Sequence, residues 1–436
     1  MKSDVTSKNK ISKKREDMSK LDELIKELCP NGVEYKELGE IVKSQRGKTI
    51  TKELIKDGDI PVISGGQKPA YYHNESNRKG EVITVAGSGA YAGFVMYWDK
   101  PIFVSDAFSI ECDKSYLNIK YIYYFLQNNQ MKIHSLKKGG GVPHVYFKDM
   151  QKFLVPVPPL EVQNEIVRIL DNFTALTAEL TAELTVRKKQ YSWYRDYLLK
   201  FENKVEIVKL KDIATEMYRG NGIKREEVRE TGIPCVRYGE IYTEYGIAFE
   251  KTKSYTDENL ITNKKYIDYG DILFAITGES VEEIGKSTAY IGKEKCLVGG
   301  DILVMKHKQD PVYLSYVLST ENAQKQKSKG KIKSKVVHTN ATDIGEIEIP
   351  LPPLEVQKRI VEVLDNFEKI CNDLNIGLPA EIEARQKQYE FYRNFLLTFN
   401  NEEIYALSKQ ASKQASKQAS KQASKQASKQ ASKPKI

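Results

Sequence analysis

Apolar residues recur at alternating steps of four and three positions through two long segments of the chain. The seam of the first segment runs from Ile166 to Phe201 and is interrupted only by Thr177 and Arg187. This spacing places one apolar stripe along a helix, as in coiled coils. Two prolines open each segment, and the first turn of a helix tolerates proline. The pattern predicts two long helices.

The second seam has one irregularity at residues 374–382, where two steps of four follow each other. Four inserted residues produce such a stutter. Gly377 and Pro379 lie within it, and proline interrupts a helix. We therefore expect a kink or break in the second helix and a continuous first helix. Two seams in one chain most simply pack on each other in antiparallel orientation. The seam residues singled out as packing or partner surface are Leu170, Phe173, Leu180, Leu184, Tyr191, Tyr194, Leu364, Phe367, Tyr389 and Tyr392.

The two helical segments are copies of each other. PVPPLEVQNEIVRILDNF at 156–173 matches PLPPLEVQKRIVEVLDNF at 350–367 at 13 of 18 positions. RKKQYSWYRDYLLKF at 187–201 matches RQKQYEFYRNFLLTF at 385–399 at nine of 15. An intramolecular brace explains the apolar seam but not the matched polar positions. We interpret the matched polar residues as one partner surface that is presented twice.

A globular segment precedes each helix, and the two globular segments share only an outline. Period-two runs such as GEVITVAG at 80–87 and GDILFAIT at 270–277 predict strands. The fold class expected is α+β (mixed α/β): two domains separated by two long, antiparallel coiled-coil-like helices, with a pseudo-twofold internal repeat. The expected boundaries are 1–20 for a disordered extension, 21–155 for the first domain, 156–203 for the first helical spacer, 204–349 for the second domain, 350–400 for the second helical spacer and 401–436 for a low-complexity tail.

Net charge changes this picture little. The total is +9, but residues 1–20 contribute +4 and residues 401–436 contribute +6, which leaves −1 for the rest. The tail repeats S-K-Q-A, a composition that cannot bury a core, and we expect it to be inert; an electrostatic DNA tether is the alternative. Met18 reads like a natural start. The dispersed cysteines and histidines and the lack of a long apolar run predict a cytoplasmic chain without a metal site.

Lysine-rich and glycine-rich stretches precede both helices. Glycine allows close approach of the backbone, and lysine contacts phosphates, which supplies affinity rather than sequence choice. A solvated surface loop is the alternative. The candidate DNA contacts in these stretches are Lys137, Lys138, Gly139, Gly140, Lys327, Lys329, Lys331 and Lys333. Further candidates chosen from loop position are Arg46, Lys48, Gly65, Gly66 and Arg219.

The motif PPLEVQxxIVxxLDNF followed by RxKQYxxYRxxLL, present twice, resembles the repeats of type I restriction-modification specificity subunits. The resemblance implies that each domain is a target-recognition domain, which reads one half of a bipartite, asymmetric site in double-stranded DNA. It implies that the helices bind two modification subunits, which hold S-adenosylmethionine and methylate adenine. Restriction (helicase-nuclease) subunits that use ATP and Mg²⁺ would then join. No catalytic residue and no cofactor are expected on this chain.

A tandem repeat T-A-E-L occupies residues 177–184. In similar family members the number of such units sets the gap between the half-sites. Helix geometry supports this role, because four residues add about 6 Å and about 40° of rotation. The first helix is therefore expected to set the spacing.

Catalytic alternatives have weaker support. The glycines at 87–93 lack the spacing of a cofactor turn, and Asp310-Pro311-Val312-Tyr313 departs from D-P-P-Y. A self-contained methyltransferase would need both motifs. A specificity subunit of a related, type IIB-like system and a coiled-coil adaptor without DNA readout remain the alternatives.

Overall fold

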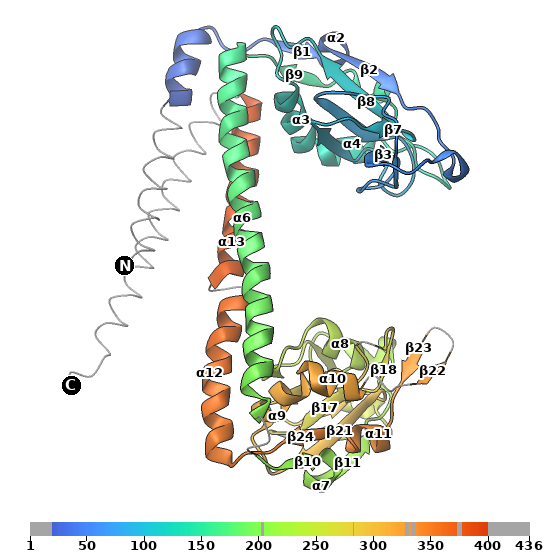
Figure 1. The fold of residues 1–436 in the computed structure, drawn as a ribbon, viewed down its shortest axis with the longest axis vertical. Helices are drawn as coiled ribbons and strands as arrows, with labels where there is room; N and C mark the ends of the chain where they lie inside the picture. Colours follow the sequence, from blue (N-terminus) through green and yellow to red (C-terminus); the bar gives the residue numbers. More distant parts are fainter. Residues whose placement is uncertain are drawn as a thin grey trace, which may run out of the picture. The chain divides into compact units, whose positions relative to one another are not determined.

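The computed structural model describes residues 20–201, 205–281, 283–327, 331–333, 336–372 and 377–399. The chain divides into two compact units. Unit 1 comprises Met1–Glu179 and Glu383–Ile436, and unit 2 comprises Leu180–Ile382. No helix in the described part of the chain is long and apolar enough to cross a membrane. Each unit holds one globular domain together with part of the two helical spacers (Figure 1).

The domain of unit 1 is built on a four-stranded antiparallel sheet of order β2-β8-β5-β6, beside a three-stranded sheet of order β4-β3-β7. The strands are β1 (Tyr35–Glu37), β2 (Val42–Arg46), β3 (Ile60–Ile63), β4 (Tyr71–His73), β5 (Val82–Ala86), β6 (Val95–Trp98), β7 (Phe103–Val104), β8 (Ala107–Cys112) and β9 (Leu154–Pro156). The helices are α2 (Leu38–Ile41), η1 (Lys52–Leu54), α3 (Ile119–Asn128), α4 (Gln130–Ser135) and α5 (Phe147–Met150). The GEVITVAG run forms β5, whose residues are all buried.

The domain of unit 2 follows the same plan with longer sheets, of orders β11-β21-β17-β19-β14 and β12-β15-β13-β20-β16. Their strands are β11 (Ala214–Arg219), β12 (Val228–Arg229), β13 (Ile233–Val236), β14 (Ala248–Phe249), β15 (Ser254–Thr256), β16 (Tyr266–Ile267), β17 (Ile272–Ala275), β19 (Ser287–Tyr290), β20 (Cys296–Val298) and β21 (Ile302–His307). The remaining strands are β10 (Ile207–Lys209), β18 (Thr277–Gly278), β22 (Lys331–Lys333), β23 (Val336–His338) and β24 (Glu348–Pro350). The helices are α7 (Leu210–Ile213), η3 (Arg225–Glu227), α8 (Tyr238–Thr243), η4 (Glu258–Leu260), α9 (Pro311–Leu318), α10 (Glu321–Lys327) and α11 (Ala341–Gly345).

The spacers are helical, as the seams predict. The first is a single helix, α6 (Leu160–Leu198), and the second is divided into α12 (Leu354–Asn372) and α13 (Gly377–Thr398). Gly377, the first residue of α13, adopts the left-handed φ of 80°, so a right-handed helix cannot run through this residue from the preceding segment. Leu374 lies outside the described residues. The expected break in the second spacer is thus confirmed.

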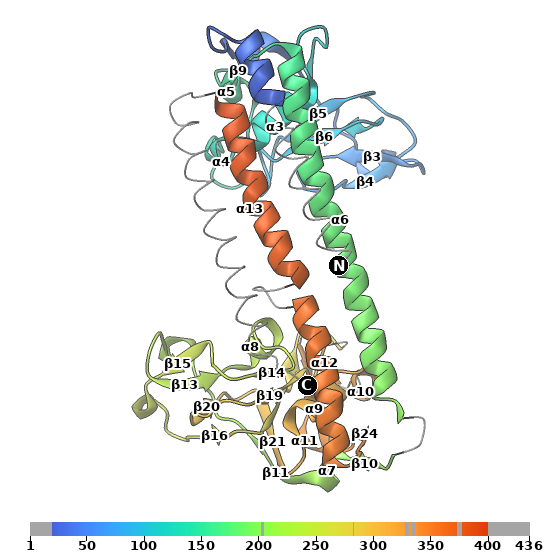
Figure 2. The same ribbon diagram turned by 90° about the vertical axis from the view of Figure 1, so that its left-hand side faces the viewer.

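The seams meet through the same repeat residues in both units. In unit 1, Phe173 stacks on Tyr392 with ring centroids 5.3 Å apart. In unit 2, Phe367 stacks on Tyr194 at 5.7 Å. Each pair joins the Phe of LDNF to the second Tyr of QYxxY, so the packing repeats with the sequence. Within each unit the two spacer segments run antiparallel (Figures 1 and 2). The mixed α/β class and the internal repeat are confirmed.

The matched polar residues also bind within the chain. Gln163 and Gln357 are completely buried. The Gln163 amide oxygen accepts from Asn118 N at 2.8 Å, and the Gln357 amide oxygen accepts from Asp310 N at 3.0 Å. These contacts hold each domain to its own spacer. The interpretation of these glutamines as a partner surface is therefore wrong.

Two tyrosines on one short helix complete each of these attachments. Tyr121 donates to Pro156 O and Tyr313 to Pro350 O, both at 2.9 Å. The carboxylates of the LDNF motif accept from the second tyrosine: Asp171 from Tyr124 at 2.5 Å and Asp365 from Tyr316 at 2.7 Å. We call these repeated contacts the domain clamp, made by Gln163, Asp171, Tyr121 and Tyr124 in unit 1 and by Gln357, Asp365, Tyr313 and Tyr316 in unit 2.

Candidate nucleic-acid interface

An Arg-Gly pair ends the first strand of each main sheet. A Cβ on Gly47 would lie 2.1 Å from Ser105 O, and a Cβ on Gly220 would lie 2.1 Å from Gly299 O. Only glycine fits such a close approach of two backbones. The approach places Arg46 and Arg219 at equivalent positions of the two domains. Both arginines were candidates in the sequence analysis because of their expected loop position. Nothing in the sequence indicated that they occupy equivalent positions in the two domains.

Backbone hydrogen bonds tie the loops around each Arg-Gly pair together. Lys48 N donates to Val104 O at 2.9 Å, and Asn221 N donates to Val298 O at 3.1 Å. Ser105 N bonds Ile63 O in unit 1 as Gly299 N bonds Val236 O in unit 2, both at 2.8 Å. We call the loops joined in this way the strand-end rim of each unit. Its segments are 46–48, 63–66, 87–89 and 104–106 in unit 1, and 219–221, 236–237, 276–277 and 299–301 in unit 2.

The two rims share a framework but differ in their side chains. Gly87 N donates to Asp106 O, and Ile276 N donates to Asp301 O. These two aspartates are therefore equivalent. Asp106 accepts a short hydrogen bond from Ser88, whereas Asp301 pairs with Arg219. One scaffold thus presents different hydrogen-bonding groups in the two domains.

Arg78 supports the strand-end rim of unit 1 through hydrogen bonds to its backbone. The sequence analysis did not name Arg78 as a candidate residue. Arg78 as a whole is only 7% exposed. It donates to Arg46 O at 3.1 Å, to Asn77 O at 2.7 Å and to Ser109 Oγ at 2.7 Å. Desolvation lowers the pKa of Arg78 from its ordinary value. All three nitrogens of its guanidinium donate to acceptors inside the protein. Arg78 therefore positions the end of β2 and is not itself a DNA contact.

The Lys-Gly stretch of unit 1 lies beside its rim. The backbone of Lys138 pairs with His144, which bridges to Ser88, and Gly89 N bonds Pro143 O. Lys137 Nζ donates to Ala90 O at 2.8 Å, and Lys138 Nζ forms an ion pair with Asp149 at 2.5 Å.

Glycines complete this side of the rim. A Cβ on Gly65 would lie 2.5 Å from Ser88 O, and Gly139 adopts φ 107°. The structure therefore brings Gly65, Lys137, Lys138 and Gly139 to one place. Gly66 follows in the same loop, and a Cβ on Gly140 would meet open space.

The lysines of unit 2 behave differently from the prediction. Lys327 is 3% exposed, and its amine donates to Leu318 O at 2.6 Å and to Ser287 Oγ at 3.2 Å. Burial lowers the pKa of Lys327 to about 7. A buried amine cannot reach a DNA phosphate, so its assignment as a DNA contact is wrong. Lys331 and Lys333 lie in β22, which pairs with β23; Lys329 lies outside the described residues.

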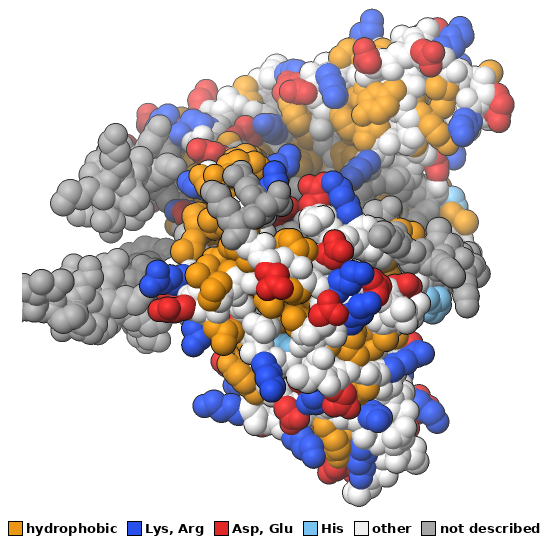
Figure 3. All heavy atoms as spheres, turned by 60° about the horizontal axis from the view of Figure 1, so that its bottom comes forward, with side chains coloured by type: hydrophobic (Ala, Val, Ile, Leu, Met, Phe, Trp, Pro, Cys, Tyr) orange, Lys and Arg blue, Asp and Glu red, His pale blue; other side chains and the backbone are white. Residues whose placement is uncertain are grey.

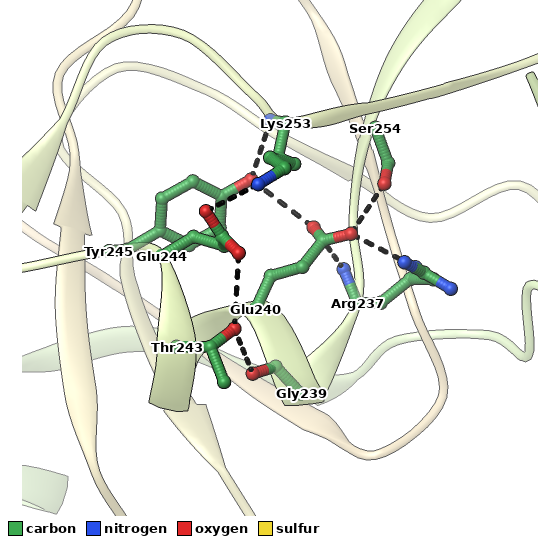
Figure 4. Close-up of polar contacts among 8 residues, drawn as sticks. All are labelled: Arg237, Gly239, Glu240, Thr243, Glu244, Tyr245, Lys253 and Ser254. Atoms are coloured by element: carbon green, nitrogen blue, oxygen red, sulfur yellow. Dashed lines mark hydrogen bonds and ion pairs between the residues drawn. The ribbon is translucent and has the colours of Figure 1, made fainter. Parts of the chain in front are cut away.

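Arg237 directly follows β13 at the rim of unit 2 and was missed by the sequence analysis. Its Nε donates to Glu240 at 2.9 Å, and Glu240 is 5% exposed. Ser254 and Tyr245 donate to the same carboxylate (Figure 4). Three polar residues, which together supply four donors, thus meet around one buried acid. The only sequence signal was an Arg three residues before a Glu, which is also a common helix-capping pattern.

The spacer seam residues are mostly buried within the chain. Leu170, Phe173, Leu180, Tyr191, Leu364 and Tyr389 are each at most 9% exposed. Leu184 and Tyr392 are partly exposed. Tyr194 and Phe367 are more than one third exposed, and beside them Trp193 and Tyr197 are about 60% exposed and stack at 5.3 Å. The exposed aromatic surface of α6, not its buried seam, is available for contact with another molecule.

The surface carries no strong overall charge. Basic and acidic side chains are interspersed on the face drawn in Figure 3. Many of the charged groups at the rims and clamps are paired, for example Arg219 with Asp301 and Lys120 with Asp171. Among the described residues, no group of three or more His, Cys, Asp or Glu side chains could hold a metal ion. Attraction for a nucleic acid would therefore depend on local groups.

Known proteins resemble this chain over most of its length. The sequence model of the type I restriction modification DNA specificity domain matches residues 30–186 and 202–384. The specificity subunit of the type I restriction enzyme EcoR124I/EcoR124II from Escherichia coli is 30% identical, over 88% of this chain and 99% of its own length. A putative type I specificity subunit from Haemophilus influenzae is 28% identical, over 84% and 96%.

Solved structures share the fold. The S subunit of a type I restriction-modification system from M. genitalium aligns with a TM-score of 0.51 at 17% identity, covering 84% of this chain and 97% of its own. A chain from a structural study of complex assembly and conformational transition of the type I R-M system aligns with a TM-score of 0.53 at 16% identity, with the same coverage.

Proposed function

Because this chain belongs to the family of type I restriction modification DNA specificity domains, we propose that its two rims read the two halves of one DNA target. The chain is the sequence-recognition subunit of a type I complex. The observation that carries the proposal is the repeated strand-end rim, in which one backbone framework presents different side chains in each unit. Different side chains on the same framework suit an asymmetric, bipartite target.

The rims offer the two kinds of contact that DNA recognition needs. Backbone amides and lysines beside glycine suit phosphates, which position a protein on the duplex. Arginines suit base edges, which carry the sequence. In unit 1 the first kind would come from the Lys137–Gly140 loop beside the rim, and the second from Arg46. In unit 2 the arginines dominate, because Lys327 is buried.

We propose that catalysis lies on other subunits. Two modification subunits would carry S-adenosylmethionine, and restriction subunits would carry ATP and Mg²⁺, so this chain needs no active site or cofactor. The exposed pair Trp193 and Tyr197 supports a docking surface on α6, because large exposed aromatics are enriched where proteins associate. Reading chromosomal DNA would place the complex in the cytoplasm.

The test of this function is a map of methylated adenines. The full-length chain is co-expressed with the modification subunit of its own system in a host without adenine methylation. We expect a bipartite, asymmetric motif. The variant Arg46→Ala should weaken selection in one half of the motif only, and Arg219→Ala in the other half only. A continuous motif, or no motif, would contradict the proposal.

A further inference from the structure

Glu240 forms a fully occupied anchor at the rim of unit 2. Its Oε1 accepts from Arg237 Nε at 2.9 Å and from Ser254 Oγ at 2.5 Å. Its Oε2 accepts from Arg237 N at 3.2 Å and from Tyr245 Oη at 3.2 Å. An ionised carboxylate offers about four acceptor positions. All of them are used inside the protein, so Glu240 has no capacity left for a ligand.

The guanidinium of Arg237, in contrast, is bound to Glu240 through only one of its three nitrogens. Within the described part of the chain its Nε is bonded, and its two terminal nitrogens have no protein acceptor. Its side chain is 36% exposed. Figure 4 shows the terminal nitrogens pointing away from the Glu240 carboxylate. The anchor therefore fixes the direction of the side chain and leaves two parallel donors available.

These donors lie at the rim. Arg237 Cα would be 3.5 Å from a Cβ on Gly299, and Val236 O accepts from Gly299 N. On the same turn, Arg219 donates to Gly300 O and pairs with Asp301. Residues 299–301 thus connect the two arginines.

Unit 1 has no counterpart of this arginine. Ile63 O accepts from Ser105 N as Val236 O accepts from Gly299 N, so Ser64 follows β3 where Arg237 follows β13. The two domains therefore differ at a matched position of the rim. Two domains that recognise different DNA sequences should carry different side chains at equivalent positions of their rims.

We propose that Arg237 reads a guanine in the half-site of unit 2, through its two terminal nitrogens. Guanine presents O6 and N7 as adjacent acceptors in the major groove, and a guanidinium matches both. This inference rests on the proposed function.

The anchor favours a base over a phosphate as the partner. Arg237 and Glu240 together carry no net charge, so the pair has little long-range attraction for the backbone. The contact with Glu240 instead fixes the direction of the Arg237 side chain before DNA is bound. A side chain that is fixed in advance loses less conformational entropy on binding. Direction matters for a base edge and much less for a phosphate.

The experiment measures binding of the full-length complex to a duplex library in which every target position is varied. Arg237→Lys keeps the charge but loses the paired donors. We expect the preference for G·C at one position of one half-site to fall on the order of 5- to 100-fold, the range of a bidentate contact. The other half-site should be unchanged. Arg229→Ala is the matched control, since that arginine donates to Glu226 O and Val228 O of its own segment.

Other results would overturn the inference. Equal weakening on all sequences would show a phosphate contact, and an unchanged preference would show that Arg237 only supports the fold. The double variant Arg237→Gln, Glu240→Gln removes both charges, so no buried charge is left unpaired. It should stay folded, as judged by its melting temperature, and lose the same preference. If the wild-type complex itself shows no preferred sequence, the proposed function fails instead.

Discussion

Gly47 and Gly220 determine where an arginine stands in each domain. Each lies so close to a neighbouring carbonyl that a Cβ would have to displace backbone, and each follows the arginine that ends the strand. Arg46 and Arg219 were predicted as candidates from an expected loop position, whereas the structure places them as the last residues of β2 and β11. The sequence could not predict the close approach, because the partner carbonyls belong to residues far along the chain.

We expect Gly220→Ala to disturb the rim of unit 2. The new Cβ would clash with Gly299 O at 2.1 Å, and such an overlap with backbone typically costs about 1–3 kcal/mol. The recognition of one half-site should weaken at least several-fold in a binding assay with varied duplexes. Gly222→Ala is the control, because a Cβ there meets nothing within 4 Å. Equal effects of the two variants would argue against a steric role for Gly220.

Lys327 shows a second limit of sequence reasoning at this scale. In unit 2, a Cβ on Gly285 would lie 3.3 Å from the side chain of Lys327. In unit 1, a Cβ on Gly93 would lie 2.9 Å from the side chain of Ile133. The aliphatic stem of Lys327 thus fills a core position that isoleucine fills in the other domain. A lysine among other lysines looks like a surface residue in sequence, and only the fold separates it from them.

The stability of the protein should depend on pH through Lys327. Its pKa is about 7 in the folded chain and about 10.4 when unfolded, so the unfolded state binds more protons between these values. The free energy of unfolding should therefore rise with pH from about 7 to about 10, by a few kcal/mol. Urea denaturation across this range should show a smaller rise for Lys327→Met. Identical pH profiles for both proteins would contradict the lowered pKa.

At the scale of elements, the helices were the most predictable part. Heptad spacing at Leu170, Phe173, Leu364 and Tyr389 depends only on neighbours along one helix, and these side chains are buried as expected. The domain clamp was not predictable, because Gln163 and Asp171 find their partners through tertiary contacts. The same holds for Glu240 on α8, whose four donors come from β15, from Tyr245 beyond the end of α8 and from the rim.

Helix α6 gives a prediction about spacing. Deleting Thr181–Leu184 removes one T-A-E-L unit, which shortens the helix by about 6 Å and rotates its remaining C-terminal turns by about 40°. The unspecified gap between the half-sites should shorten, while both half-sites stay the same. Mapping of methylated adenines in cells that carry the deletion measures this. Full methylation at the original spacing would show that the length of α6 does not set the gap between the half-sites.

At the scale of the whole molecule, charge does not identify a DNA-binding protein here. The basic excess lies in residues 1–20 and 401–436, both outside the part that the structure describes except for Lys20. The remaining chain is close to neutral, so recognition has to come from a few placed groups at the rims. Long-range attraction to DNA would then be weak without the tails.

Truncation after Leu407 separates attraction from recognition. The tail beyond it carries only basic side-chain charges, so its removal should leave the methylated motif unchanged. If the tail attracts DNA, binding to unspecific duplex should also become less sensitive to salt. Methylation mapping and binding at two salt concentrations measure the two effects. A changed motif would mean that the tail takes part in reading.

The domain clamp has a consequence for inheritance. The residues that receive each domain, a glutamine and an aspartate of the repeated motif, are the same in both copies. The two tyrosines that bind each spacer, one at a proline carbonyl and one at the aspartate, are also the same. A gene segment that is exchanged within the two repeats would carry a new reading surface onto an unchanged attachment. Novel targets can then arise by shuffling whole cassettes, with no need to redesign the joint.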